Sequence, residues 1–89
     1  MDKTAGLVGT LRASYQKIGS PSSILLAFSG GADSMALLRG LASLREEMGF
    51  ALYLAHVNHG LRASSAEEEV FVQEVASRMG LPLHVARVN

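Results

Sequence analysis

Three short apolar segments alternate with two segments of helical periodicity, and this alternation constrains the fold more than any other feature. The apolar segments span residues 23–28, 51–57 and 83–88. Between them, apolar residues recur at helical spacing over residues 34–48 and 65–79. Helices that connect apolar strands predict an α/β fold with a parallel sheet and right-handed crossovers. Two such crossovers in succession give the spatial strand order 3-2-1 with both helices on one face, which is a partial Rossmann-like sheet.

The boundaries of the two connecting helices carry recognisable signals. Gly49 and Gly80 are suited to end a helix, and Pro82 prevents the second helix from continuing. The second helix also has a start signal, because the sequence Ser-Ala-Glu-Glu from Ser65 fits a capping box with that serine as the cap. The residues predicted to form its buried stripe are Phe71, Val72, Val75, Ala76 and Met79.

A further helix is predicted ahead of the alternating segments, over residues 3–18. The Gly-Ser-Pro sequence that follows it breaks the chain. The residues that lie on one face of this helix are Leu7, Leu11, Tyr15 and Ile18. We therefore expect an N-terminal helix and turn over residues 1–21, and the N-terminal half of a nucleotide-binding domain over residues 22–89.

The strand over residues 23–28 is expected to have an unusual environment. Its apolar residues do not alternate with polar ones, which indicates a strand that is buried on both faces. In the order 3-2-1, however, this strand lies at an edge of the sheet, because the second half of a doubly wound fold is missing. An exposed apolar edge recruits another strand. We therefore expect a truncated sheet, and a chain that self-associates through residues 23–28.

Composition excludes several classes of protein. A length of 89 residues allows one small domain. Basic and acidic residues number eight each, which argues against a free-standing nucleic-acid binder. The absence of cysteine excludes a disulfide scaffold, a thiolate zinc site and a cysteine nucleophile. No apolar run approaches the roughly 18 residues of a membrane span, so a cytoplasmic protein without membrane contact is expected.

The segment that most strongly indicates chemistry is Ser-Gly-Gly-Ala-Asp-Ser, which joins the first apolar strand to the helix after it. Two adjacent glycines allow a sharp turn and a close approach of the backbone to a ligand. The N–H groups and the positive dipole end at the helix start suit a phosphate. A carboxylate beside phosphates implies a bridging magnesium ion, which Asp33 would hold. The predicted phosphate-binding residues are Ser29, Gly30, Gly31, Ala32, Asp33 and Ser34.

The same segment also has a purely structural interpretation, as a tight turn with Asp33 or Ser34 as the helix N-cap. The motif is longer than a cap requires, which favours phosphate binding. It is not a mononucleotide P-loop, because no lysine follows the glycines, and the dinucleotide fingerprint G-x-G-x-x-G does not occur. A P-loop kinase and a nicotinamide dehydrogenase are therefore set aside.

These residues resemble the signature of the PP-loop, or N-type ATP pyrophosphatase, superfamily, whose members cleave ATP between the α and β phosphates. A second set of segments narrows the resemblance to one family within that superfamily. The segments that resemble the tRNA(Ile)-lysidine synthase family are residues 56–62 (His-Val-Asn-His-Gly-Leu-Arg), Ser65, 67–69, 71–75 and 80–82. The resemblance covers the chain from about residue 22 to 88.

The resemblance implies a ligase that uses ATP and Mg²⁺. ATP would adenylate the C2 carbonyl of the wobble cytidine in a tRNA(Ile) with a CAU anticodon, and the ε-amine of free lysine would displace AMP to give lysidine. The resemblance implies that residues 29–34 hold the phosphates of ATP and that Asp33 binds the metal ion or activates the substrate. His59 and Arg62 would be auxiliary catalytic residues. The 89-residue chain would be the ATP-binding portion of such an enzyme and inactive alone.

Other polar residues have simpler interpretations. His56 is expected to be a packed or hydrogen-bonded histidine at a strand end, and His84 is expected to pack within the third strand. His56 and His59 lack the cysteine or nearby carboxylate that would complete a metal site. Residues 67–69 are expected to be a solvated helix start, where the helix dipole favours three glutamates.

Two alternative functions stay open from the sequence. One is another PP-loop enzyme that modifies tRNA or forms an amide, such as a tRNA thiolase or an amidotransferase synthetase. The other is a non-catalytic module that binds an adenine nucleotide, or a truncated product without function. A basic tRNA-binding domain in the continuation of the chain would favour the synthase over both.

Overall fold

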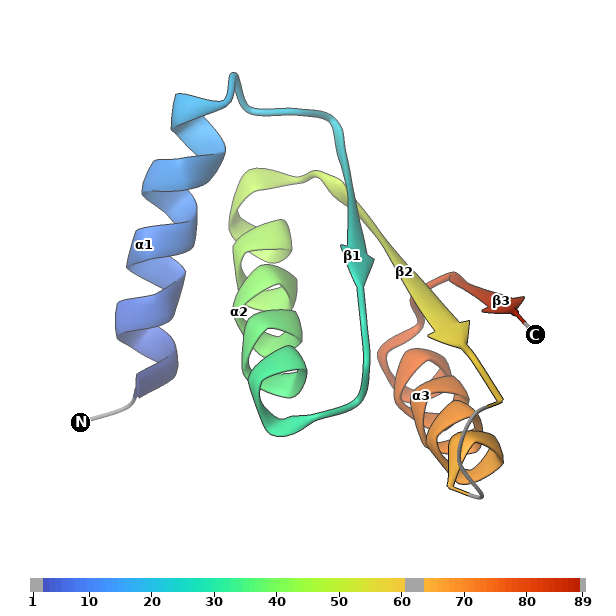
Figure 1. The fold of residues 1–89 in the computed structure, drawn as a ribbon. Helices are drawn as coiled ribbons and strands as arrows, with labels where there is room; N and C mark the ends of the chain where they lie inside the picture. The colour runs from blue at the N-terminus through green and yellow to red at the C-terminus, as the bar shows by residue number, and fades with distance from the viewer. Residues whose placement is uncertain (1–2, 61–63, 89) are drawn as a thin grey trace.

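The computed structural model describes residues 3–60 and 64–88. Within these ranges, strands and helices alternate in the predicted order (Figure 1). Their bounds are α1 (Lys3–Lys17), β1 (Ser23–Ala27), α2 (Ala32–Met48), β2 (Ala51–Asn58), α3 (Ser65–Met79) and β3 (Leu83–Arg87). The connecting helices α2 and α3 end as predicted, with Gly49 and Gly80 in the left-handed conformation that favours glycine.

In the described part of the chain, the strands form a parallel sheet in the order β1-β2-β3. This confirms the predicted α/β fold and the predicted 3-2-1 arrangement. β2 lies at the centre, where Leu54 is in register with Leu26 of β1 and with Leu83 of β3. Because parallel strands run the same way, the turns that follow β1 and β2 lie at the same edge of the sheet.

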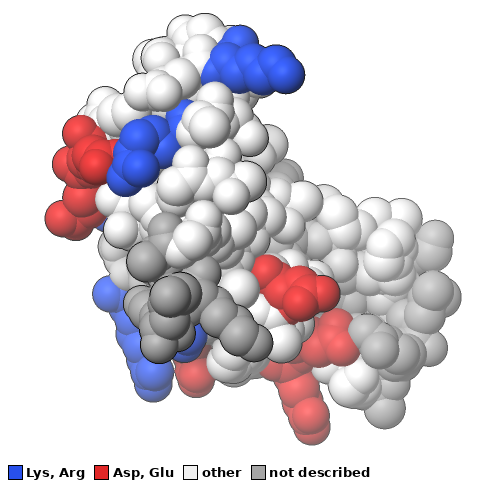
Figure 2. Space-filling model, turned by 90° about the vertical axis from the view of Figure 1, so that its left-hand side faces the viewer, with Lys and Arg blue, Asp and Glu red and all other residues white. Residues whose placement is uncertain are grey.

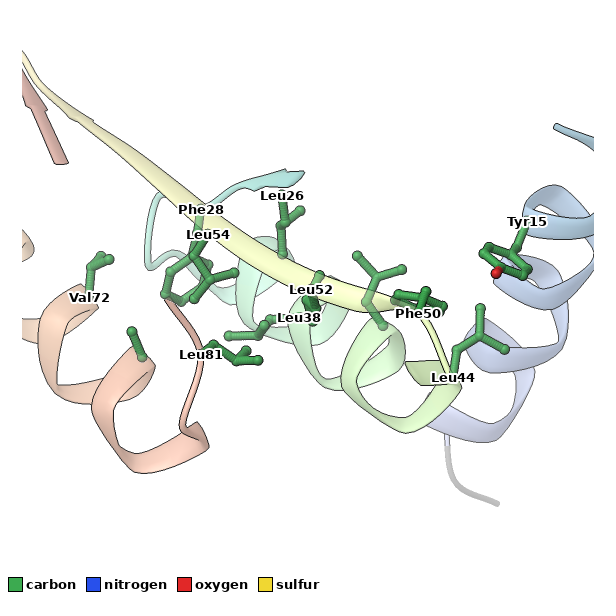
Figure 3. Close-up of a cluster of buried hydrophobic side chains, with 12 residues drawn as sticks. Tyr15, Leu26, Phe28, Leu38, Leu44, Phe50, Leu52, Leu54, Val72 and Leu81 are labelled. Carbon is green, nitrogen blue, oxygen red and sulfur yellow. The ribbon is translucent and has the colours of Figure 1, made fainter. Parts of the chain in front are cut away.

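The two faces of the sheet differ in how they are covered. α2 and α3 pack on the face that carries Leu26, Leu52 and Leu54, which are buried (Figure 3). The other face, which we call the open face, carries exposed apolar side chains from β1 and β2: Leu25, Tyr53 and Val57. The first of these is 66% exposed. The prediction that the strand over residues 23–28 is buried on both faces was therefore wrong, because both crossover helices lie on the same face.

α1 extends the helical layer beside α2 (Figure 1). A Cβ atom on Gly40 of α2 would lie only 2.8 Å from Cδ1 of Leu11, so the glycine allows the two helices to approach closely. Near the end of α1, the ring of Tyr15 lies 5.1 Å from the ring of Phe50. Ile18 was predicted to lie on the same helical face as Leu7, Leu11 and Tyr15, but it lies past the end of the helix and is exposed. α1 is thus anchored on α2.

The start and the buried stripe of α3 differ from the prediction. The N-cap is Ser64, without a side-chain capping bond, and not Ser65. The Glu68 N–H donates to the Ser64 carbonyl at 2.9 Å, which closes the first helical turn one residue earlier than the capping box requires.

Phe71 of α3 is exposed although it was predicted to be buried. The next residue, Val72, is buried against the sheet. Because successive residues of a helix point about 100° apart, Phe71 points away from the sheet.

Charges of both signs occur on the surface beside α1. Figure 2 shows small groups of basic and acidic side chains on a largely uncharged face. Arg12 of α1 and Glu47 of α2 form an ion pair between the two helices, with Nε and Oε2 2.6 Å apart. The described part of this face therefore carries charges of both signs. As a separate finding, none of the helices in the described ranges combines the length and the apolar character needed to cross a membrane.

Candidate functional site

The turn from β1 to α2 lies at the carboxyl edge of the sheet and contains the predicted phosphate-binding residues. The backbone changes direction at Gly30, whose φ of 86° is in the left-handed region. The hydroxyl oxygens of Ser29 and Ser34 are 2.8 Å apart, and the Gly31 N–H donates to Oγ of Ser29 at 3.3 Å. We call residues 29–34 the glycine turn. Its internal hydrogen bonds join uncharged groups only.

The structural interpretation of this turn named Asp33 or Ser34 as the helix N-cap, and that assignment is wrong. The N-cap of α2 is Gly31, without a side-chain capping bond, and the helix begins at Ala32. Asp33 is exposed in the first helical turn, near the positive end of the helix dipole. The first N–H groups of a helix have no carbonyl within the helix to accept them. The start of α2 therefore offers an anion-binding arrangement beside a carboxylate that the helix does not need for capping.

The two glycines of the turn have different surroundings. Among the described residues beyond its two chain neighbours, a Cβ atom on Gly31 would meet only Oγ of Ser29, at 3.6 Å, so this part of the chain leaves space there. A Cβ atom on Gly30 would lie 3.2 Å from the ring of Phe71 and 3.3 Å from Cγ2 of Val72. The exposed Phe71 of α3 therefore lies against the glycine turn. Gly30 therefore has little room for a side chain, whereas Gly31 borders space that the described residues leave open.

The turn that follows β2 is held by a different set of contacts. Oδ1 of Asn58 accepts the Gly60 N–H at 2.9 Å, and Nδ2 of Asn58 donates to Oε1 of Glu69 at 3.1 Å. Nη2 of Arg87 donates to Oε2 of the same carboxylate at 2.8 Å. We call Asn58, Glu69 and Arg87 the carboxylate clasp. It joins the ends of β2 and β3 to the first turns of α3.

The carboxylate clasp affects the ionisation of Glu69. Its side chain is only 12% exposed. The hydrogen bond from Arg87, followed by the one from Asn58, lowers the pKa of Glu69 below its usual value of 4.5. Sequence reasoning missed this cluster. A signal was present in Asn-His-Gly, because an asparagine followed two residues later by glycine is typical of a turn closed by the asparagine side chain.

The histidines have distinct positions. His56 is buried on the covered face of the sheet, and its Nδ1 lies 2.9 Å from the carbonyl oxygen of Phe28. The prediction of a hydrogen-bonded histidine at a strand end is confirmed. His59 is exposed beyond the end of β2. His84 was predicted to pack, but it is exposed, because its register with Ala55 places it on the open face.

The predicted site residues are brought together only in part. His59 follows β2 and the glycine turn follows β1, so both lie at the same edge of the sheet. Arg62, the other predicted auxiliary residue, lies outside the described residues. In residues 3–60 and 64–88, no three His, Cys, Asp or Glu side chains are grouped so that they could hold a metal ion.

Two hollows meet at the glycine turn, and Ser29 and Glu68 line both. The first, of about 550 Å³, lies at the ends of β1 and β2 and is lined by backbone and side chains that include Phe28, His56, Asn58 and His59. The second, of about 460 Å³, separates the turn from the start of α3 and is lined by Gly30, Gly31, Ser64, Glu67, Glu68 and Phe71. Glu68 was predicted only as part of a solvated helix start. That Glu68 lines both hollows depends on the packing of α3 beside the glycine turn, which the sequence pattern did not predict.

A glycine turn that leads from a parallel strand into a helix, at the carboxyl edge of an open sheet, is the arrangement in which α/β domains bind phosphates. The model of the PP-loop domain family matches residues 7–89. The chain therefore belongs to the PP-loop domain family.

The chain is also similar to several curated proteins named tRNA(Ile)-lysidine synthase, which confirms the resemblance drawn from the sequence. It is 50% identical over 64 residues to the protein of Lactococcus lactis subsp. lactis (strain IL1403), which covers 72% of this chain and 15% of that protein. It is 47% identical over 73 residues to the protein of Dehalococcoides mccartyi (strain CBDB1), covering 81% and 16%. It is 35% identical over 75 residues to the protein of Petrotoga mobilis (strain DSM 10674 / SJ95), covering 84% and 24%. The chain spans between 15% and 24% of the length of these three relatives.

Proposed function

We propose that this chain binds ATP at the glycine turn and acts as the ATP-binding portion of a tRNA(Ile)-lysidine synthase. The observation that carries the proposal is the start of α2. There a glycine serves as N-cap, the space beside Gly31 is open, and Asp33 is left without a capping role. The similarity to proteins named tRNA(Ile)-lysidine synthase supports the choice of reaction.

The proposed reaction has two steps. The wobble cytidine of tRNA(Ile) with a CAU anticodon attacks the α phosphate of ATP through its C2 oxygen, which forms an adenylated base and releases pyrophosphate. The ε-amine of free lysine then attacks C2, and AMP leaves with the oxygen. The glycine turn holds the phosphates, and the adenine lies in the hollow at the ends of β1 and β2. His59 and Arg62 are proposed as auxiliary residues at the same edge.

A magnesium ion fits the residues of the glycine turn. Mg²⁺ takes oxygen ligands, and in nucleotide sites it uses one or two carboxylates together with substrate phosphates and water. Asp33 supplies one carboxylate, and Ser34, the next residue in the sequence, supplies a hydroxyl that contacts the hydroxyl of Ser29. The bound ion would neutralise phosphate charge close to the Asp33 carboxylate. We therefore propose that Asp33 holds Mg²⁺ and that the ion binds together with ATP.

We infer that the tRNA and lysine contacts lie mainly in residues other than these, since the chain spans 15–24% of the three relatives. Its net charge of zero supports this inference, because tRNA phosphates require a basic surface. The 89 residues alone are therefore proposed to bind ATP without completing the reaction. Because the substrate is tRNA, we assign the activity to the cytoplasm.

We also infer that the isolated chain self-associates through β1. β1 is an edge strand of the described sheet, and its exposed Leu25 lies on the open face. An apolar edge of this kind recruits another strand. Sedimentation of the purified chain at micromolar concentration tests the inference, with Leu25→Lys as the variant expected to shift the distribution towards monomer. A wild-type chain that sediments as a stable monomer would contradict it.

The reaction is tested in a chimera in which this chain replaces the matching segment of the Lactococcus lactis relative. The chimera should release pyrophosphate only when tRNA(Ile), lysine and Mg-ATP are all present. Asp33→Asn keeps the size of the side chain but removes its charge, so turnover should fall by orders of magnitude while the fold is retained. A chimera that binds ATP but never forms lysidine would favour a non-catalytic nucleotide-binding module. Nearly intact turnover in Asp33→Asn would remove the proposed metal role.

A further inference from the structure

The end of β1 is attached to β2 in two ways. Phe28 follows the last residue of β1 and immediately precedes the glycine turn. Its N–H donates to the carbonyl of Ala55 at 2.7 Å, so strand pairing continues one residue past β1. Its own carbonyl oxygen lies 2.9 Å from Nδ1 of His56. A carbonyl can only accept a hydrogen bond, so Nδ1 of His56 carries the hydrogen.

His56 occupies a place where an apolar residue would be expected. It belongs to the row of β2 side chains that faces α2 and α3, after Leu52 and Leu54, and it is 5% exposed. Burial of a polar ring is unfavourable unless the ring is hydrogen-bonded, and here the bond to Phe28 meets that need. A leucine would fill the same core without polar atoms. The imidazole therefore supplies something that packing alone does not, namely a donor to one particular carbonyl.

That carbonyl is coupled to the glycine turn through the backbone. The C=O of Phe28 and the N–H of Ser29 belong to one peptide group, which is planar, so a bond that orients the first also orients the second. The Ser29 N–H points to Oγ of Ser34 at 3.4 Å, and the Ser29 hydroxyl contacts both Oγ of Ser34 and the Gly31 N–H. One of these hydrogen bonds is therefore donated by the peptide group that His56 holds, and the other two are made by the side-chain hydroxyl of Ser29, the residue that follows this peptide group.

We propose that His56 is a positioning residue for phosphate binding. Its Nδ1–H fixes the peptide group between Phe28 and Ser29, and through it the direction in which the glycine turn presents its donors. The inference rests on the proposed function, because phosphate binding is the property that is positioned. It assigns to His56 a role that acts through the backbone of the glycine turn.

Two substitutions separate positioning from packing. His56→Leu keeps an apolar volume in the core but removes the donor. His56→Asn packs less well, yet its side-chain N–H₂ can take the place of Nδ1–H. We therefore expect His56→Leu to weaken Mg-ATP binding by the 89-residue chain about tenfold, and His56→Asn to stay within about twofold of the wild type. Thermal unfolding should show the opposite order, with His56→Asn the less stable of the two.

Leu52→Val serves as the matched control, because it trims the same buried row without touching Phe28. It should lower the unfolding temperature and leave the affinity for Mg-ATP unchanged. Affinities that simply follow stability across the four proteins, or an unchanged affinity in His56→Leu, would overturn the proposal.

Nuclear magnetic resonance gives a second readout that does not depend on ATP. The ¹⁵N shifts of the His56 ring should show the Nδ1–H form, and the amide signals of Ser29 and Gly30 should move in His56→Leu and return in His56→Asn. A ring protonated on Nε2 alone, or amide signals that do not respond, would overturn the proposal even if the variants unfold too easily for binding measurements. If the wild type fails to bind Mg-ATP while these signals behave as expected, the proposed function is wrong and the coupling from His56 to the turn is still established.

Discussion

The two turns at the carboxyl edge of the sheet are held together in opposite ways. The glycine turn after β1 uses hydroxyl and amide groups at 2.8–3.4 Å, and all of them are uncharged. The turn after β2 is held by the carboxylate clasp, in which Asn58 and Arg87 both bond to Glu69. Neutral contacts at an exposed turn are weak enough to be exchanged for those of an anion, whereas hydrogen bonds to a charged group are stronger. One turn is thus suited to receive a ligand and the other to fasten α3 and β3.

This difference leads to a general expectation. Changes in the glycine turn that leave the protein folded should alter ATP affinity, and changes in the carboxylate clasp should alter stability.

The largest effect, a loss of ATP affinity, is expected from Gly31→Val. The φ of Gly31 is −74° and its Cβ position is open, so the variant should fold, with about 1 kcal/mol lost for a poorer N-cap. The added branch would occupy the phosphate position and weaken ATP binding at least about a hundredfold, equal to about 2.7 kcal/mol.

Calorimetric titration with Mg-ATP, together with thermal unfolding of the same samples, checks this expectation. Gly9→Ala is the control and should bind like the wild type, because the added Cβ lies on α1 and, apart from its chain neighbours and the backbone of that helix, has no described atom within 4 Å. ATP affinity that persists in a folded Gly31→Val protein would break the assignment of the glycine turn to phosphate.

Gly30→Ala should act on the fold. The residue has a φ of 86°, and its Cβ would contact Phe71 at 3.2 Å, so we expect a loss of about 1–3 kcal/mol in the free energy of unfolding. Gly49→Ala is a close control, because Gly49 has a φ of 80° but open surroundings, and it isolates the backbone strain. Urea unfolding of both variants should show the larger loss at Gly30. Equal losses would mean that the contact with Phe71 contributes nothing.

Glu69→Gln should lower stability in a pH-dependent way without changing ATP affinity. The pKa of Glu69 is lowered in the folded chain by Arg87 and Asn58, so its carboxylate stabilises the fold above the usual value of 4.5, and this contribution is lost as the pH falls below that value. The wild type and the variant should therefore differ in unfolding temperature at neutral pH and converge in acid. A difference that does not change with pH would show that the charge on Glu69 has no role.

The smallest effect is expected at Glu47→Gln. Arg12 also lowers the pKa of Glu47, and the contact is short at 2.6 Å, but the Glu47 side chain is 48% exposed compared with 12% for Glu69. Water and salt screen such a pair. The unfolding temperature should change less than in Glu69→Gln, and the difference should shrink further at high ionic strength. A larger change in unfolding temperature in Glu47→Gln than in Glu69→Gln would contradict the expectation that the exposed Arg12–Glu47 pair stabilises the fold less than the carboxylate clasp.

The order of the elements could be predicted because it depends on local patterns. Apolar runs gave the strands, helical spacing gave α2 and α3, and Gly49 and Gly80 marked the helix ends, since a left-handed residue is a local backbone requirement. The predictions that failed concern which way a side chain faces. Phe71 and His84 were assigned to the core, but each is exposed, because the direction of a side chain depends on which face the neighbouring elements cover.

The sequence by itself determined the α/β class, the parallel order of the strands and the position of the glycine turn between β1 and α2. Those features follow from periodicity and from glycine, which act over a few residues. Only the tertiary structure decided that Gly31 caps α2, that Phe71 lies against Gly30, and that residues 58, 69 and 87 form one clasp. The contact of Phe71 with Gly30 and the clasp join side chains or turns from separate elements. Such contacts are set by the register of the strands and the packing of the helices on one face, which no local pattern encodes.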